Sequence, residues 1–105
     1  MKTIMKEELR KKMEAGEVVV IEVLGAEKFK KEHIKGAVNI PLKEIVTKAS
    51  KEYDKDDMIV VYCSDFECTA SPTAAQKLQD AGFTNIFDFE GGKKEWKEAG
   101  YPMEN

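Results

Sequence analysis

Short apolar runs alternate along the chain with stretches whose apolar residues recur every three or four positions. The runs at 17–23 and 58–62 are rich in β-branched residues, which predicts strands buried on both faces. Two shorter runs, 38–40 and 86–89, predict further strands. Helical spacing predicts helices over about residues 5–15, 26–31, 42–49, 73–80 and 93–99.

Glycine, proline and serine mark the expected helix ends. Gly16 and Gly82 follow the last periodic residues of two helices, where glycine commonly terminates the turn. Pro72 stands where a first helical residue is expected, because its fixed φ suits that position. Ser71 is then predicted to be the N-cap of the 73–80 helix.

This alternation of strands and helices predicts the fold class, an α/β protein with a central parallel sheet flanked by helices on both faces. In such sheets ligands bind beyond the carboxyl ends of the strands. Cys63 directly follows the strongest predicted strand and precedes a predicted helix. The sequence therefore predicts that Cys63 lies at the functional edge of the sheet.

Length and charge limit the classes of function. With 105 residues, the chain is expected to be a single domain spanning 1–105. A net charge of −3 makes nucleic acid and anionic membranes poor partners, and no apolar run is long enough to span a bilayer. The first residues lack the apolar segment of a signal peptide, so we expect a cytoplasmic protein. Two cysteines five residues apart do not have the spacing of a zinc site, so neither a metal nor a cofactor is expected.

The loop after the 58–62 strand carries the candidate chemistry. Its backbone amides and the following helix N-terminus can together stabilise an anion, either the Cys63 thiolate, its persulfide or a bound oxyanion. By position alone, Cys63 could equally be a buried structural thiol. For Cys68, a resolving thiol, a second sulfur carrier and an inert loop residue all remain open.

Three segments resemble the rhodanese family. Residues 29–41, FKKEHIKGAVNIP, follow the pattern F-x-x-x-H-I-x-G-A-x-x-I-P. Residues 82–102 follow G-F-x-x-[IV]-x-x-x-x-G-G-x-x-x-W-x-x-x-G-x-P. Between them, residues 60–63 read VVYC, similar to the strand and cysteine that open the rhodanese active-site loop.

The resemblance implies a sulfurtransferase. Rhodaneses accept sulfane sulfur on a cysteine as a persulfide and pass it to a thiophilic acceptor, and only Cys63 occupies that cysteine's position. The resemblance implies a structural role for His33 and core positions for Phe83 and Trp96. It also implies that the loop's backbone amides bind the substrate, namely those of Ser64, Asp65, Phe66, Glu67, Cys68 and Thr69.

The chain departs from the rhodanese pattern at three points. The loop is about two residues longer than in common rhodaneses. No Arg or Lys occurs between Lys55 and Lys77, so the arginine that clamps the oxyanion in related phosphatases is missing. Glu22-Val23-Leu24 replaces the usual D-V-R. We therefore expect a small-molecule or protein persulfide as donor and a thiol as acceptor, rather than the thiosulfate dianion.

Two other functions are open on the sequence. A rhodanese-fold domain can act as a non-catalytic binding or regulatory module. Alternatively, Cys63 and Cys68 could cycle through a disulfide in a small thiol-redox protein, provided that the loop folds back far enough for the sulfurs to meet. The oligomeric state is not predicted.

Overall fold

A parallel sheet forms the centre of the protein. The computed structural model describes residues 2–105. Its five strands all run parallel, as predicted for the fold class. In spatial order they are β1 (Lys2–Thr3), β6 (Ile86–Asp88), β5 (Ile59–Tyr62), β2 (Val19–Glu22) and β4 (Val38–Asn39).

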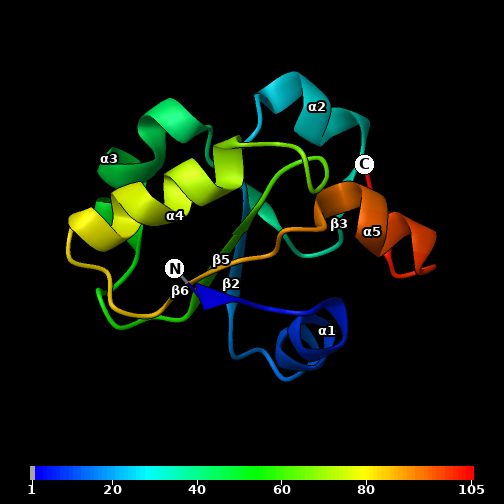
Figure 1. Ribbon diagram of the computed structural model, residues 1–105, viewed down its shortest axis with the longest axis horizontal. Coiled ribbons are helices and arrows are strands. Elements are labelled where there is room, and N and C mark those ends of the chain that lie inside the picture. Colours follow the sequence, from blue (N-terminus) through cyan, green and yellow to red (C-terminus); the bar gives the residue numbers. More distant parts are fainter. Residues whose placement is uncertain (1) are drawn as a thin grey trace.

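Helices cover both faces of the sheet, which confirms the predicted architecture (Figure 1). On one face lie α3 (Ile45–Glu52), entered through the short 3₁₀ helix η1 (Leu42–Glu44), and α4 (Ala70–Asp80). The other face is covered by α1 (Lys6–Glu14) and α5 (Gly92–Glu98). The short helix α2 (Ala26–Lys31) follows β2 and buries no side chain fully.

Side chains along β5 alternate between two separate cores, as the pleat of a strand requires. Val60 and Tyr62 pack with Trp96 of α5 on one face. Val61 and Cys63 pack with the buried residues of α3 and α4 on the other. The cysteine sulfur therefore belongs to the α4 side of the sheet.

The start of α4 differs from the sequence prediction. The helix begins at Ala70, with Thr69 as its N-cap residue, so Ser71 lies in the first turn and is not the cap. The Thr73 hydroxyl donates to the carbonyl of Thr69 at 2.7 Å and reinforces this earlier start. As a result, the Ser71 side chain is free to face the interior of the protein, where it is 2% exposed.

Four two-residue strands are too short for sequence periodicity to predict all of them. The sequence indicated β4 but not β1, nor the antiparallel pair β3 (His33–Ile34) and β7 (Met103–Glu104). This second sheet holds the C-terminal segment against the segment after α2.

The structural role expected for His33 is confirmed. Its Nδ1 lies 2.7 Å from the carbonyl oxygen of Phe29 and its Nε2 lies 3.2 Å from Glu104 Oε1. Its ring also stacks on that of Phe29. Trp96 is buried as expected and donates its Nε1–H to the carbonyl of Pro102.

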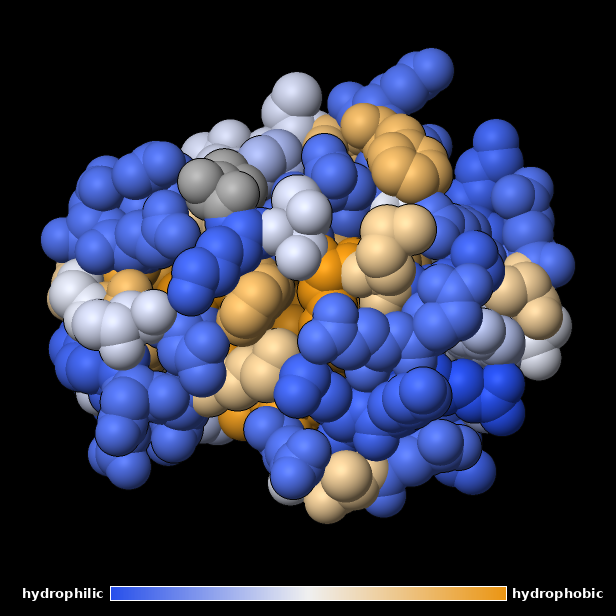
Figure 2. All heavy atoms as spheres, turned by 60° about the horizontal axis from the view of Figure 1, so that its bottom comes forward, coloured by the Kyte–Doolittle hydropathy of each residue, from blue (hydrophilic) through white to orange (hydrophobic). Residues whose placement is uncertain are grey.

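One face of the molecule is covered mostly by hydrophilic side chains, with hydrophobic residues gathered toward its middle (Figure 2). Among residues 2–105, no helix has the combination of length and apolar character that crossing a membrane requires.

Candidate functional site

Cys63 stands at the carboxyl end of β5, with 1% of its surface exposed. The N-terminus of α5 fixes its backbone: the Lys93 amide donates to the Cys63 carbonyl and the Lys94 amide to the Ser64 carbonyl, both at 3.0 Å. Gly92, with φ of 62°, allows this approach. A Cβ at that position would collide with the Cys63 carbonyl oxygen and lie 2.9 Å from the Ser64 carbonyl carbon. The start of the loop is therefore held in place by a neighbouring element.

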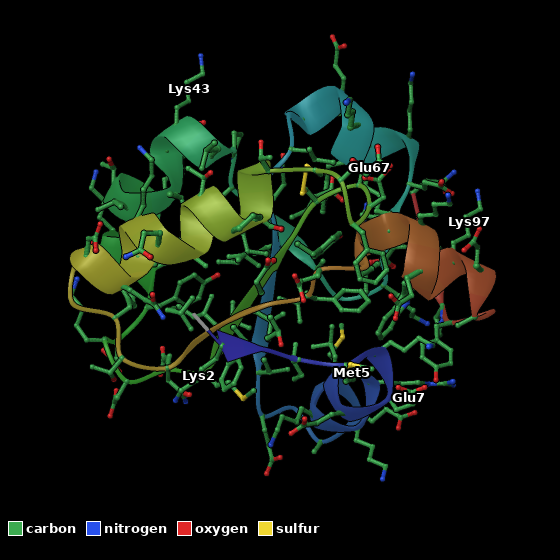
Figure 3. The ribbon with its side chains drawn as sticks, viewed as in Figure 1. Lys2, Met5, Glu7, Lys43, Glu67 and Lys97 are labelled. Carbon is green, nitrogen blue, oxygen red and sulfur yellow. A yellow bond between two sulfur atoms is a disulfide. The ribbon has the colours of Figure 1, made fainter. Side chains whose placement is uncertain are left out.

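The structure joins the two candidate cysteines. Cys63 and Cys68 form a disulfide, with their Cα atoms 6.3 Å apart. Cys68 is half-buried, whereas Cys63 is fully buried. Figure 3 draws the disulfide as a yellow bond near the first turn of α4, with Glu67 on the same loop. The loop thus folds back far enough for the two sulfurs to react with each other.

A turn built by Asp65 folds the loop back. Asp65 Oδ1 accepts hydrogen bonds from the amides of Glu67, at 3.0 Å, and Cys68, at 3.2 Å. The Cys68 amide also lies 3.2 Å from the Asp65 carbonyl oxygen. In this disulfide form, two of the amides expected to bind substrate therefore serve the Asp65 carboxylate instead. An amide cradle built from Ser64 to Thr69 stays a prediction for the reduced protein.

Two buried polar residues, Ser71 and Asp88, lie on the same side of the sheet as the Cys63 side chain. The Ser71 hydroxyl oxygen is 3.4 Å from Cys63 Sγ. Asp88 pairs in register with Val61, so it faces the same side of the sheet as Val61 and Cys63. The Asp88 side chain is 2% exposed, and its Oδ1 has no hydrogen-bond partner among the described residues. Burial raises the pKa of Asp88, and the hydrogen bond from Ser71 opposes this rise.

Sequence reasoning did not identify Ser71 and Asp88 as site residues. The sequence predicts Ser71 to be a helix cap, which gives it a structural role. Asp88 had a usable signal, because a carboxylate inside an otherwise apolar strand is costly to bury without a partner. Its partner, however, is 17 residues away in the sequence and is brought close only by the fold.

A second buried polar group lies on the opposite face of the sheet. Glu22, fully buried at the end of β2, is 3.0 Å from Lys93 Nζ and accepts a hydrogen bond from the Tyr62 hydroxyl at 2.9 Å. Lys93 also donates to the carbonyls of Lys28 and Glu32. Burial raises the pKa of Glu22, and Lys93 opposes this. Lys93 thus supplies a cation beside the segment where the usual D-V-R arginine is absent.

The surface around the loop is acidic and partly apolar. Phe66 is 69% exposed, and the hollow beside it lies between the loop and α5. Its lining residues are Asp65, Phe66, Glu67, Gly91, Lys94, Glu95 and Glu98. A donor approaching over this rim therefore meets four carboxylates and one lysine.

The sequence profile of the rhodanese-like domain matches residues 5–99. The chain therefore belongs to the rhodanese-like domain family. Within the matched range, Cys63 follows β5 as the sequence resemblance implied, and four of the five strands of the central sheet lie in that range, all except β1.

Individual relatives of this chain are named for different functions. The chain is 36% identical over 101 residues to an HTH-type transcriptional regulator of Mycobacterium tuberculosis, covering 96% of this chain but only 44% of that protein. It is 37% identical over 76 residues to a thiosulfate sulfurtransferase of Escherichia coli, covering 71% of this chain and 70% of the relative. A Bacillus halodurans protein of known crystal structure superposes with a TM-score of 0.91 at 26% identity, over 99% of this chain and 77% of the other.

Proposed function

We propose that this chain is a sulfurtransferase in which Cys63 accepts sulfane sulfur and Cys68 acts as the resolving thiol. The observation that carries the proposal is the pairing of Cys63, at the carboxyl end of β5, with Cys68, five positions further along the chain. Membership of the rhodanese-like family and the relative named a thiosulfate sulfurtransferase support the first half of the proposal.

The first step loads sulfur onto the protein. The Cys63 thiolate attacks the outer sulfur of a persulfide donor, R–S–SH. A bond forms between Cys63 Sγ and that sulfur, the donor S–S bond breaks, and the donor leaves as R–S⁻. Cys63 then carries –S–SH, and an acceptor thiolate can take the terminal sulfur in a second displacement of the same kind.

Cys68 offers a second outcome for the bound sulfur. Its thiolate attacks Cys63 Sγ, the disulfide forms, and the terminal sulfur leaves as HS⁻. The two cysteines lose two electrons and the sulfane sulfur gains them, so the step balances. A dithiol reductant returns the disulfide to two thiols by thiol–disulfide exchange. The bond between Cys63 and Cys68 is the expected product of this step.

The charges around the loop favour a persulfide over thiosulfate as donor. No cationic side chain occurs between Lys55 and Lys77, and Asp65 and Glu67 add two negative charges. A dianion meets about twice the repulsion of a monoanion at the same distance. Persulfides carry a single charge, or none when protonated, so this loop discriminates against them less.

Mass spectrometry of the reduced protein tests the proposal. After incubation with a small persulfide, Cys68→Ser is expected to retain one extra sulfur (about 32 Da) on Cys63, because nothing resolves it. The native chain is expected to release sulfide in a one-to-one ratio with disulfide formed. Cys63→Ser, the matched control, should neither load nor release. Absence of loading in Cys68→Ser would refute the sulfurtransferase role.

A thiol-redox protein is the second candidate, because the disulfide itself favours it. Such a protein would exchange disulfides with a dithiol partner and release no sulfide from a persulfide. The same experiment separates the two functions: disulfide formation without stoichiometric sulfide indicates thiol-redox chemistry. A non-catalytic regulatory module, the role suggested by the regulator of Mycobacterium tuberculosis, predicts neither product.

A further inference from the structure

Asp88 is a buried carboxyl group that the proposed sulfur chemistry does not use. It faces the α4 side of the sheet beside Ser71, and its Oδ1 has no hydrogen-bond partner among the described residues. Burying a carboxylate without full hydrogen bonding is costly, and a structural role alone would be served equally by an apolar or amide side chain. Its placement one hydroxyl away from Cys63 Sγ suggests a chemical reason for keeping it.

The Ser71 side chain lies between the other two groups in its effects. Its hydroxyl oxygen is 3.4 Å from Cys63 Sγ, and the same side chain lowers the pKa of Asp88. In the disulfide, Cys63 has no S–H, so of these three side chains only Ser71 carries a polar hydrogen when Asp88 is ionised. Once the disulfide is reduced, the Cys63 thiol can donate to Ser71 Oγ while the Ser71 hydroxyl donates to Asp88.

We propose that Cys63, Ser71 and Asp88 hold one proton in common, shared between the thiol and the carboxyl group through the Ser71 hydroxyl. The thiolate is then formed together with a neutral Asp88, and an ionised Asp88 keeps Cys63 as a thiol. Asp88 acts through Ser71 and is a positioning residue for the proton. The sharing of the proton does not depend on the proposed function; only its effect on sulfur transfer rests on that function.

The shared proton balances each displacement at Cys63. When Cys63 attacks the donor, its thiol proton moves to Ser71 Oγ and the Ser71 hydroxyl proton moves to Asp88. When an acceptor removes the sulfur, Cys63 leaves as a thiolate and the same proton returns along the reverse path. No proton has to enter from solvent at a sulfur that is 1% exposed.

When two acidic groups interact strongly, the pair loses its two protons in two steps, and neither step can be assigned to one group alone. Two groups that share one bridging hydroxyl lie at most about 6 Å apart, the length of two hydrogen bonds in line. At an effective dielectric near 20, a full charge at that distance changes an ionisation constant roughly a hundredfold. Glu90, exposed on the turn after β6, also raises the pKa of Asp88 through its charge.

The rate of Cys63 alkylation by iodoacetamide, followed against pH, tests the inference without any sulfur donor. Cys68→Ser serves as the parent, because it has a single thiol and cannot form the disulfide. Its rate should rise at low pH, level off as Asp88 ionises, and rise again at higher pH. Adding Asp88→Asn should give one ionisation only, with alkylation about ten- to a hundredfold faster in the pH range where the parent levels off.

Two further variants separate proximity from specific coupling. Adding Glu90→Gln removes one exposed charge near Asp88, and the two-step profile should persist. Adding Ser71→Ala removes the single O–H donor that stabilises whichever group ionises first, so the first inflection should move to higher pH. A single-step parent, or an Asp88→Asn profile equal to that of the parent, overturns the inference. If the alkylation profile of the Ser71→Ala variant equals that of the parent, Ser71 is not the link between Cys63 and Asp88.

A second measurement covers the case in which Asp88→Asn does not fold. The carboxyl ¹³C shift of Asp88 is followed against pH in Cys68→Ser and in Cys63→Ser/Cys68→Ser. The first should titrate in two steps and the second in one, because serine does not ionise in this range. Identical titrations would overturn the proposal. Since neither measurement uses sulfur transfer, failure of the proposed function leaves both of them interpretable.

Discussion

Replacing Lys93 by methionine leaves the buried carboxyl group of Glu22 without its cationic partner. Lys93 is the cation beside the fully buried Glu22, at 3.0 Å, and its own side chain is only 12% exposed. Methionine keeps the length of the side chain without the ammonium group. Removing one member of a buried pair typically costs about 3–5 kcal/mol. The partial exposure of Lys93 places this case near ~3 kcal/mol, which would lower the melting temperature by about 10–20 °C.

The loss should depend on pH in a definite direction. Burial raises the folded-state pKa of Glu22, and Lys93 opposes this, so Lys93→Met raises that pKa further. A carboxyl group with a raised folded pKa contributes its full stability below the unfolded value, about 4.3, and loses it as pH rises through the folded value. The deficit of Lys93→Met relative to the native chain should therefore be larger at pH 7 than at pH 5.

Urea unfolding at both pH values, followed by the fluorescence of Trp96, measures the effect. Glu22→Gln/Lys93→Met should recover at least half of the loss, because the uncompensated charge is gone. Lys97→Met is the matched control: it lies on the same helix, pairs with Glu32 at the surface, and should cost less than about 0.5 kcal/mol. An equal deficit at pH 5 and pH 7, or no recovery in the double variant, would refute the electrostatic explanation.

Three further substitutions probe the same region. Gly92→Ala should lower the free energy of unfolding by about 2–4 kcal/mol, measured in urea, because the residue has positive φ and its methyl group would collide with the Cys63 carbonyl oxygen. Tyr62→Phe should cost about 1–3 kcal/mol in the same assay, since buried Glu22 loses a donor. Glu67→Gln should raise kcat/KM for thiosulfate about two- to fivefold at low salt. The gain should shrink in high salt, because screening removes the repulsion. An unchanged kcat/KM at low salt would show that this carboxylate points away from the donor.

The sequence predicts the sheet well because its strands have strong local patterns. β5 is a continuous apolar run, β2 is an apolar run that ends at Glu22, and each is followed by a segment with helical periodicity. The position of Cys63 follows directly, because a residue at the end of a central parallel strand lies at the ligand-binding edge. β1 and β7 have two residues each and carry no periodicity, so only pairing with a distant segment defines them.

The surroundings of Cys63 were harder to predict, because they depend on contacts between distant segments. The Asp65 side chain folds its own loop, which no apolar pattern indicates. Asp88 and Lys93 reach the site from β6 and α5, and both lie at least 25 residues beyond Cys63. Pro72 resembles a first helical residue and so predicts Ser71 as the cap, whereas α4 begins at Ala70.

The unequal burial of the two sulfur-bearing residues decides how the disulfide opens. Thiol–disulfide exchange requires the incoming thiolate to reach one sulfur along the line of the bond. Cys63 is 1% exposed and Cys68 is half-buried, so a reductant has access to Cys68 first. The mixed disulfide then forms on Cys68, and Cys63 is expelled as the free thiolate. Reduction thus delivers the buried cysteine ready to attack, and until then the disulfide keeps it from irreversible oxidation to sulfinic acid.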